Sequence, residues 1–153
     1  MRRADRGRNS FEAYSLYASG PAAGRTGYAY APVYVHAKIA VVDDAWFTVG
    51  SANLDRRGLA TDTDMNLQAA APDIVRDLRA RLWAEHLGMS TENVGARDLA
   101  TLIDRDWKIA AERMRASVTA LSPPPQAHAY RYVVGRRPVS RVLDVVQDVT
   151  LER

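Results

Sequence analysis

The chain has 153 residues, 47% of them hydrophobic, which is enough material for one domain with its own core. Its 21 lysines and arginines exceed its 18 acidic residues by three, a mild positive charge that suits anionic phosphates but does not by itself indicate nucleic acid. The absence of cysteine excludes a disulfide scaffold and thiolate zinc sites, and no apolar run approaches the roughly 18 residues of a membrane span.

The chain opens with a basic stretch and one candidate strand. Residues 2–8 hold four arginines with no apolar stretch behind them, which excludes a signal peptide and favours a solvated tail over a lipid or nucleic-acid contact. The run 11–17 predicts an upstream strand, and the glycines and proline in 20–24 predict a loop. We therefore expect a cytoplasmic protein, with peripheral contact at a membrane as the alternative.

The next element is a strand over 32–42, because this run is rich in β-branched and aromatic residues and ends at the turn-forming pair Asp43-Asp44. Side chains alternate along a strand, so His36 and Lys38 should point to the same side, about 7 Å apart. An imidazole and an ammonium group are thereby predicted to share one face, while the apolar face carries the packing.

The later elements form a scaffold. Residues 46–49 predict a returning strand, 50–53 the loop that leaves it, and 64–71 a third strand. Pro72 suits the first turn of a helix that reaches His86, with Gly88 near its C-cap. Its predicted buried face holds Ile74, Val75, Leu78 and Leu82.

A second helix is predicted over 98–121, because apolar residues recur there at spacings of three and four. This stripe consists of Leu99, Ile103, Trp107, Ala110, Met114, Val118 and Leu121. The serine and three prolines at 122–125 should end the helix. Beyond them, 130–134 and 139–149 predict an edge strand and a partial element, or a loose extension.

Six residues form one spaced constellation, H-x-K-x4-D-x6-G-S-x-N, made of His36, Lys38, Asp43, Gly50, Ser51 and Asn53. Six fixed identities arise by chance at a given position roughly once in 10^7 to 10^8, so the pattern is not background. A neutral imidazole can attack phosphorus and form a covalent phosphoenzyme, which makes His36 the candidate nucleophile. Lys38, Ser51 and Asn53 would hold the phosphate oxygens, with Gly50 allowing a close backbone approach.

This constellation resembles the HKD motif of the phospholipase D superfamily, and the stretch up to Gly88 is similar to the C-terminal half of bacterial phospholipase D and cardiolipin synthase-like phosphatidyltransferases. The resemblance implies an α/β half-domain with a mixed sheet flanked by helices. It also implies a phosphodiesterase or phosphatidyltransferase that acts on phospholipids through a phosphohistidine intermediate, without metal or cofactor.

The resemblance assigns further roles to single residues. Asp64 stands where family members carry an acid, usually Glu, that orients the histidine, and it is therefore the fourth catalytic candidate beside His36, Lys38 and Asp43. Asp43 is typical of the family but suits a turn or supporting position better than a proton carrier. Arg57 occupies the arginine position of a downstream segment and is expected to support the site.

We predict three regions: a basic tail with a partial strand and loop over 1–27, the catalytic half-domain over 28–121, and a proline-rich linker with an extension over 122–153. The half-domain looks shortened at its front. One motif supplies one histidine, whereas the leaving alkoxide needs a second acid, so a complete site requires an identical chain or a missing N-terminal half. Alternatives are a homodimeric single-motif nuclease of the same superfamily and a non-catalytic fragment.

Each feature also has a simpler interpretation. His36 and Lys38 could face solvent without function, or the motif could be catalytically silent. Asp62-x-Asp64-x-Asn66 resembles the start of a calcium loop, but Leu67 stands where glycine is needed. His86 is interpreted as structural, stabilised by the helix dipole when protonated, and His128 as solvated. Trp107 and Met114 are interpreted as core residues.

Overall fold

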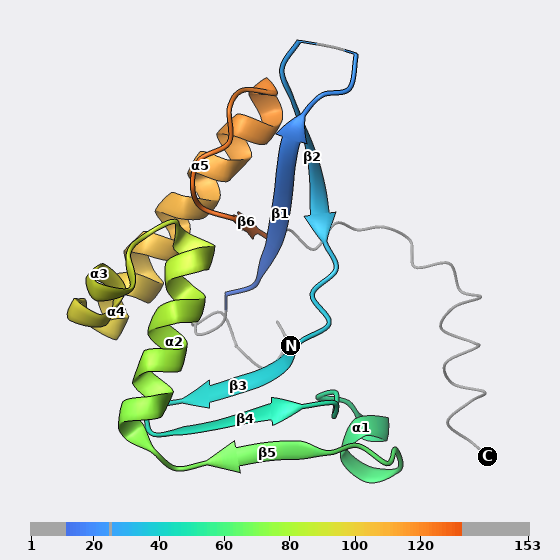
Figure 1. Ribbon diagram of the computed structural model, residues 1–153, viewed down its shortest axis with the longest axis vertical. Coiled ribbons are helices and arrows are strands. Elements are labelled where there is room, and N and C mark those ends of the chain that lie inside the picture. Colours follow the sequence, from blue (N-terminus) through green and yellow to red (C-terminus); the bar gives the residue numbers. More distant parts are fainter. Residues whose placement is uncertain (1–11, 25, 133–153) are drawn as a thin grey trace, which may run out of the picture.

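The computed structural model describes residues 12–24 and 26–132, which form two three-stranded antiparallel sheets flanked by helices (Figure 1). The expected α/β class, with helices covering sheets, is confirmed. The basic stretch 2–8 and the predicted element 139–149 lie outside the described residues.

The first sheet has the strand order β2-β1-β6 and joins segments that are far apart in the sequence. Its strands are β1 (Tyr14–Pro21), β2 (Tyr28–Val33) and β6 (Ala129–Arg131). The predicted upstream strand is present but begins at Tyr14, and it continues through Gly20 and Pro21, where a loop was expected. The loop is shorter because Gly24 and Gly27, with φ of 68° and 108°, make the reversal. β6 confirms the edge strand as far as Arg131.

The second sheet has the order β3-β4-β5 and contains the motif. Its strands are β3 (Lys38–Val42), β4 (Trp46–Gly50) and β5 (Asn66–Ala69). The prediction of one strand over 32–42 is wrong, because Val33 ends β2 in one sheet and Lys38 begins β3 in the other. Residues 34–37 connect the two without ladder partners. High β-propensity gives an extended backbone but does not select its partner strand.

The helices follow the motif. They are α1 (Arg56–Ala60), α2 (Pro72–Leu87), α3 (Thr91–Ala96), α4 (Leu99–Thr101), a π-helical turn η1 (Leu102–Asp106) and α5 (Trp107–Ala120). The two long predicted helices are confirmed, since α2 ends at Gly88 with φ of 64° and α4, η1 and α5 run on without interruption from the N-cap Asp98. α1 and α3 were not predicted.

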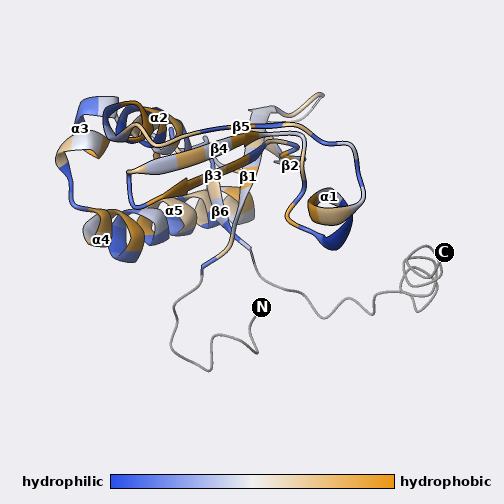
Figure 2. Cartoon of the chain, turned by 90° about the horizontal axis from the view of Figure 1, so that it is seen from below, coloured by the Kyte–Doolittle hydropathy of each residue, from blue (hydrophilic) through white to orange (hydrophobic). Residues whose placement is uncertain are grey.

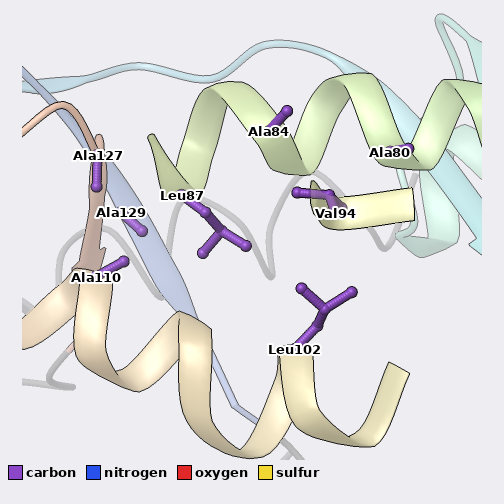
Figure 3. Close-up of a cluster of buried hydrophobic side chains, with 8 residues drawn as sticks. All are labelled: Ala80, Ala84, Leu87, Val94, Leu102, Ala110, Ala127 and Ala129. Carbon is purple, nitrogen blue, oxygen red and sulfur yellow. The ribbon is translucent and has the colours of Figure 1, made fainter. Parts of the chain in front are cut away.

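The main core lies between α2, α3, η1, α5 and β6 (Figure 3). Its buried members are Ala80, Ala84, Leu87, Val94, Leu102, Ala110, Ala127 and Ala129. Met114 is also buried and Trp107 packs against the cluster, as expected. On α2 the prediction was partly wrong: Val75 is buried but Ile74 is 61% exposed, because the inward face turns toward Arg79 and Ala80.

The motif sheet has one polar and one apolar face. Lys38, Thr48 and Asn66 lie on one side, and Ile39, Val41 and Phe47 lie on the other, which faces the helices. Figure 2 shows the apolar colouring of β3 and β4 beside α2 and α5. None of the described helices is long and apolar enough to cross a membrane.

Candidate functional site

The two leading residues of the motif meet where the chain passes from one sheet to the other. Lys38 Nζ donates to His36 Nε2 at 2.8 Å and also to the His36 carbonyl oxygen at 2.8 Å. Since an ammonium group can only donate, Nε2 accepts here and the ring proton belongs on Nδ1. His36 is exposed, and the tilted ring of Tyr34 lies beside it with a centroid separation of 5.8 Å. The predicted pairing of imidazole and ammonium is therefore present, although His36 lies just before the strand.

Gly50 lies opposite Lys38 in the ladder, and its missing side chain makes room for the chain that enters β5. A Cβ at Gly50 would stand 2.1 Å from Asn66 Oδ1 and 2.2 Å from the Met65 carbonyl oxygen. Sequence reasoning expected glycine here for the approach of a ligand. The structure shows that Met65 and Asn66 approach Gly50 closely, and the approach of a ligand stays a prediction.

Ser51 and Asn66 connect the end of β4 to the start of β5. The Met65 backbone N–H donates to Ser51 Oγ at 3.0 Å, and the Ser51 backbone N–H donates to the Met65 carbonyl at 3.0 Å. Asn66 Oδ1 accepts from the Ala52 backbone N–H at 3.1 Å, and Asn66 Nδ2 donates to Thr48 Oγ1 at 3.2 Å. The Ser51 hydroxyl, predicted to contact phosphate, is here occupied by the backbone, and sequence reasoning did not find Asn66.

The exposed Asn53 lies in the loop that leads to α1. Gly58 packs so closely on its backbone that a Cβ would meet the Asn53 carbonyl oxygen at 2.5 Å, which explains the glycine at this position. Asp55 caps α1 by accepting from the Gly58 N–H at 2.7 Å. Arg57 forms an ion pair with Asp62 at 3.3 Å and does not contact His36. This ion pair also engages Asp62 Oδ1, a carboxylate oxygen that a calcium loop beginning at Asp62 would use as a ligand.

Asp64 and Asp43 are not in contact with His36. Asp64 is exposed and lies two residues before β5, as His36 lies two residues before β3, so both are at the same end of the sheet. Asp43 lies in the turn at the opposite end of β3. The orienting role of Asp64 stays a prediction.

The neighbour of Asp43 has a structural role that the sequence did not reveal. Asp44 accepts two hydrogen bonds from Arg79 of α2, at 2.5 Å from Nε and 2.9 Å from Nη2. Both side chains are largely buried, at 15% and 5% exposure. This bidentate pair fastens the β3–β4 hairpin to α2. A buried arginine on an otherwise amphipathic helix is the only signal that could have indicated it.

Exposed apolar side chains surround the motif end of the sheet. This apolar rim consists of Val33, Tyr34, Val35, Leu54, Leu59 and Met65, with Tyr34, Met65 and Leu54 more than 80% exposed. α1 and the connection from β2 to β3 lie at this same end in Figure 1. Large apolar side chains gathered on a surface mark an interaction site.

The other two histidines lie away from the motif. Burial lowers the pKa of His86, opposed by Glu85, which raises it, and assisted by His128. The net shift thus favours the neutral imidazole, opposite to the direction expected from a helix C-terminus. The His128 ring is exposed, as expected, with Nδ1 3.3 Å from the Tyr17 carbonyl oxygen. Among the described residues, no three histidines or acids are placed to hold a metal ion.

Comparison with known proteins gives one family match and several relatives. A family model described as "Cardiolipin synthase, PLD-like domain" matches residues 6–85. Phospholipase D alpha 1 of Cynara cardunculus is 31% identical over 134 residues, which cover 75% of this chain and 16% of that protein.

Two further relatives cover half of this chain. Phospholipase D delta of Arabidopsis thaliana is 35% identical over 97 residues, or 11% of its length. Phospholipase D1 of Schizosaccharomyces pombe is 33% identical over 96 residues, or 7% of its length. The chain thus spans less than a fifth of these relatives. No solved structure matches the chain significantly.

Proposed function

Because the chain belongs to the phospholipase D-like domain family, we propose that it is one half of a phosphodiesterase or phosphatidyltransferase that acts on phospholipids through a phosphohistidine at His36. The observation that carries this proposal is the 2.8 Å contact between Lys38 Nζ and His36 Nε2 on an exposed surface. This contact places a cation beside the nucleophilic nitrogen. The tautomer leaves Nε2 unprotonated, so its lone pair can attack once Lys38 moves away.

In the proposed first step, a non-bridging phosphate oxygen draws the Lys38 ammonium away from Nε2. The freed lone pair attacks phosphorus, the N–P bond forms, and the P–O bond to the leaving alcohol breaks. Lys38 stabilises the charge that develops on the phosphate oxygens, with the Asn53 amide as a second donor. The leaving alkoxide takes its proton from an acid outside this motif. In the second step water or an alcohol attacks phosphorus, gives its proton to that same group, and the N–P bond breaks.

The apolar rim favours a lipid substrate over a nucleic acid. A phospholipid brings acyl chains together with its phosphodiester, and exposed side chains such as Tyr34, Leu54 and Met65 beside His36 suit that mixture. Of the two arginines of α1, Arg57 is neutralised by Asp62, and Arg56 is the one without an ion pair among the described residues. Strong nucleic-acid binding would need several unpaired cations along the site.

The test is to trap the phosphoenzyme on the full chain at high protein concentration. A phospholipid labelled in its phosphate should leave acid-labile, alkali-stable label on the protein, and His36→Asn should abolish it. His128→Asn is the matched control, because it removes an exposed histidine outside the motif and should keep the label. Label that persists in His36→Asn would overturn the assignment. Transfer from labelled oligonucleotides but not from lipid would support the nuclease instead.

A further inference from the structure

A groove lies on the side of the motif sheet opposite to Lys38, between β3 and the helices α2 and η1. It has a volume of about 510 Å³ and is walled by Ile39, Val41, Leu82, Trp83, Ile103 and Trp107. Asp44 and Arg79 line it as well. It is thus separate from the proposed catalytic surface.

The groove is incompletely covered by the described residues. Ile39 is 38% exposed and Ile103 is 44% exposed, although both belong to apolar walls. Arg79 is 4% exposed, and its Nη1 is buried without a hydrogen-bond partner among the described residues. A buried donor that lacks an acceptor costs about 1–3 kcal/mol, so an occupant that brings apolar groups and an oxygen acceptor would be stabilised here.

The described chain ends beside this groove. The Tyr132 backbone N–H donates to the Ala13 carbonyl oxygen at 2.9 Å. Tyr14, which follows Ala13 in the sequence, packs its ring 4.8 Å from the ring of Trp107, and Trp107 forms part of the groove wall. The 21 residues that follow Tyr132 therefore start next to the open surface.

Those residues have a composition that matches the groove. Val139, Val142, Leu143, Val146 and Val149 recur at spacings of three and four, as on one apolar face. The seven residues from 132 to 139 can span up to about 24 Å, which reaches the groove easily. By contrast, residues 1–11 contain only Met1 and Phe11 as large apolar side chains.

Charge agrees for the stretch that leads to this occupant but not for residues 139–149 themselves, which carry Asp144 and Asp148 against Arg141. Residues 133–141 carry three arginines, Arg136, Arg137 and Arg141, and no acid. The groove carries two aspartates, Asp43 and Asp44, against the single cation Arg79. The connecting stretch would thus approach a surface of opposite sign.

We propose that residues 139–149 of this same chain occupy the groove, with their apolar face on Trp83, Ile103 and Trp107 and a backbone carbonyl as the acceptor for Arg79 Nη1. The segment acts as an internal brace between the motif sheet and the helices. This docking does not depend on His36 being catalytic.

Cross-linking tests the proposal on the full chain, which has no natural cysteine. Ile103→Cys is combined in turn with Val142→Cys, Leu143→Cys and Val146→Cys, and each double variant is oxidised at low concentration. At least one pair should form an intramolecular disulfide in most of the protein. The matched control replaces Ile103→Cys by Gln68→Cys, an exposed position on the other face of the same sheet, and should not cross-link. Cross-links only between chains, rising with concentration, would overturn the proposal in favour of a second copy, and no cross-link in any pair would also overturn it.

Tryptophan fluorescence gives a second readout that needs no cysteine. In a Trp46→Phe background the emission reports only Trp83 and Trp107. Ending the chain after Tyr132 should shift this emission to the red and increase its quenching by acrylamide, and a peptide of residues 133–153 should reverse both changes. Unchanged emission after truncation, or a reversal by short-chain phospholipid but not by the peptide, would overturn the proposal.

Discussion

Gly50 shows how a single motif residue can be fixed by folding as well as by chemistry. Gly50→Ala places a Cβ within 2.2 Å of the Met65 carbonyl oxygen, a backbone atom that cannot move without breaking the Ser51–Met65 contacts. We expect the substitution to lower the free energy of unfolding by at least about 2 kcal/mol, the cost of overpacking at a rigid site. Urea denaturation measures this change.

Gly95 in α3 provides the control, because a Cβ there meets nothing within 4 Å. Gly95→Ala should leave stability unchanged or raise it by up to about 1 kcal/mol, since alanine favours a helix more than glycine does. If Gly50→Ala were as stable as Gly95→Ala, the close packing of β4 on the start of β5 would be refuted.

His86 gives a pH-dependent prediction. Burial lowers the pKa of His86 below its ordinary value of 6.5. The unfolded chain therefore takes up a proton near pH 6.5 while the folded chain does not. The contribution of neutral His86 to folding stability is thus fully present above pH 6.5 and is lost as the pH falls toward the folded pKa. The urea midpoint should drop between about pH 7 and about pH 5.5, above the range of ordinary carboxylates.

His86→Gln should flatten this dependence, whereas His128→Gln should retain it because the His128 side chain is exposed. A His86→Gln protein with the same loss of stability over this interval would show that another group causes it.

At the scale of elements, the attachment of the β3–β4 hairpin to α2 depends on one buried ion pair. Asp44→Asn keeps the shape of the side chain and tolerates the positive φ of 53°, but it removes the charge that faces Arg79. Breaking a buried pair leaves the partner's charge uncompensated, so we expect a loss of about 3 kcal/mol in unfolding free energy.

Asp43→Asn is the matched control, because Asp43 has the same φ of 53° and is exposed. It should change stability by no more than about 0.5 kcal/mol, as is usual at the surface. Equal losses for the two variants would mean that the turn, and not the ion pair, determines the effect.

The two long helices were predictable because their signals are local. Pro72 begins α2 and Gly88 ends it, and the stripe from Leu99 to Val118 has a helical period. Strand pairing was not predictable in this way. The pairing of β1 with β6 joins Leu16 to Ala129, and no local pattern selects a partner more than 100 residues away.

The site was predictable to a similar degree. The sequence predicted His36 and Lys38 on one side, about 7 Å apart. Their side chains do meet, but His36 precedes β3, so strand alternation does not explain the contact. The sequence did not predict Asn66, Met65 or the Asp44–Arg79 pair, since these contacts arise only when β5 and α2 pack against the hairpin.

At the scale of the whole molecule, the remaining question is how one motif could complete the proposed two-step reaction. The chain carries a single H-x-K-x4-D pattern. Attack on one side of phosphorus and protonation of the leaving group on the other require two groups in line. The apolar rim around His36 also leaves a surface that a partner could cover. Both considerations favour a second motif, supplied by an identical chain or by an N-terminal half.

We therefore predict that the monomer of this chain is inactive and that any activity depends on protein concentration. A two-fold dimer would bring equivalent His36 side chains across its axis to one phosphate. Mixing wild type with an excess of His36→Ala should then suppress activity by more than simple dilution, because mixed dimers lack one imidazole. An excess of His128→Ala, which alters an exposed ring outside the motif, should not. Sedimentation of the same samples gives the number of chains in each assembly. Full turnover by a monomer, independent of concentration, would contradict the prediction, while an inactive chain that never dimerises would instead indicate that the second motif belongs to a missing N-terminal half.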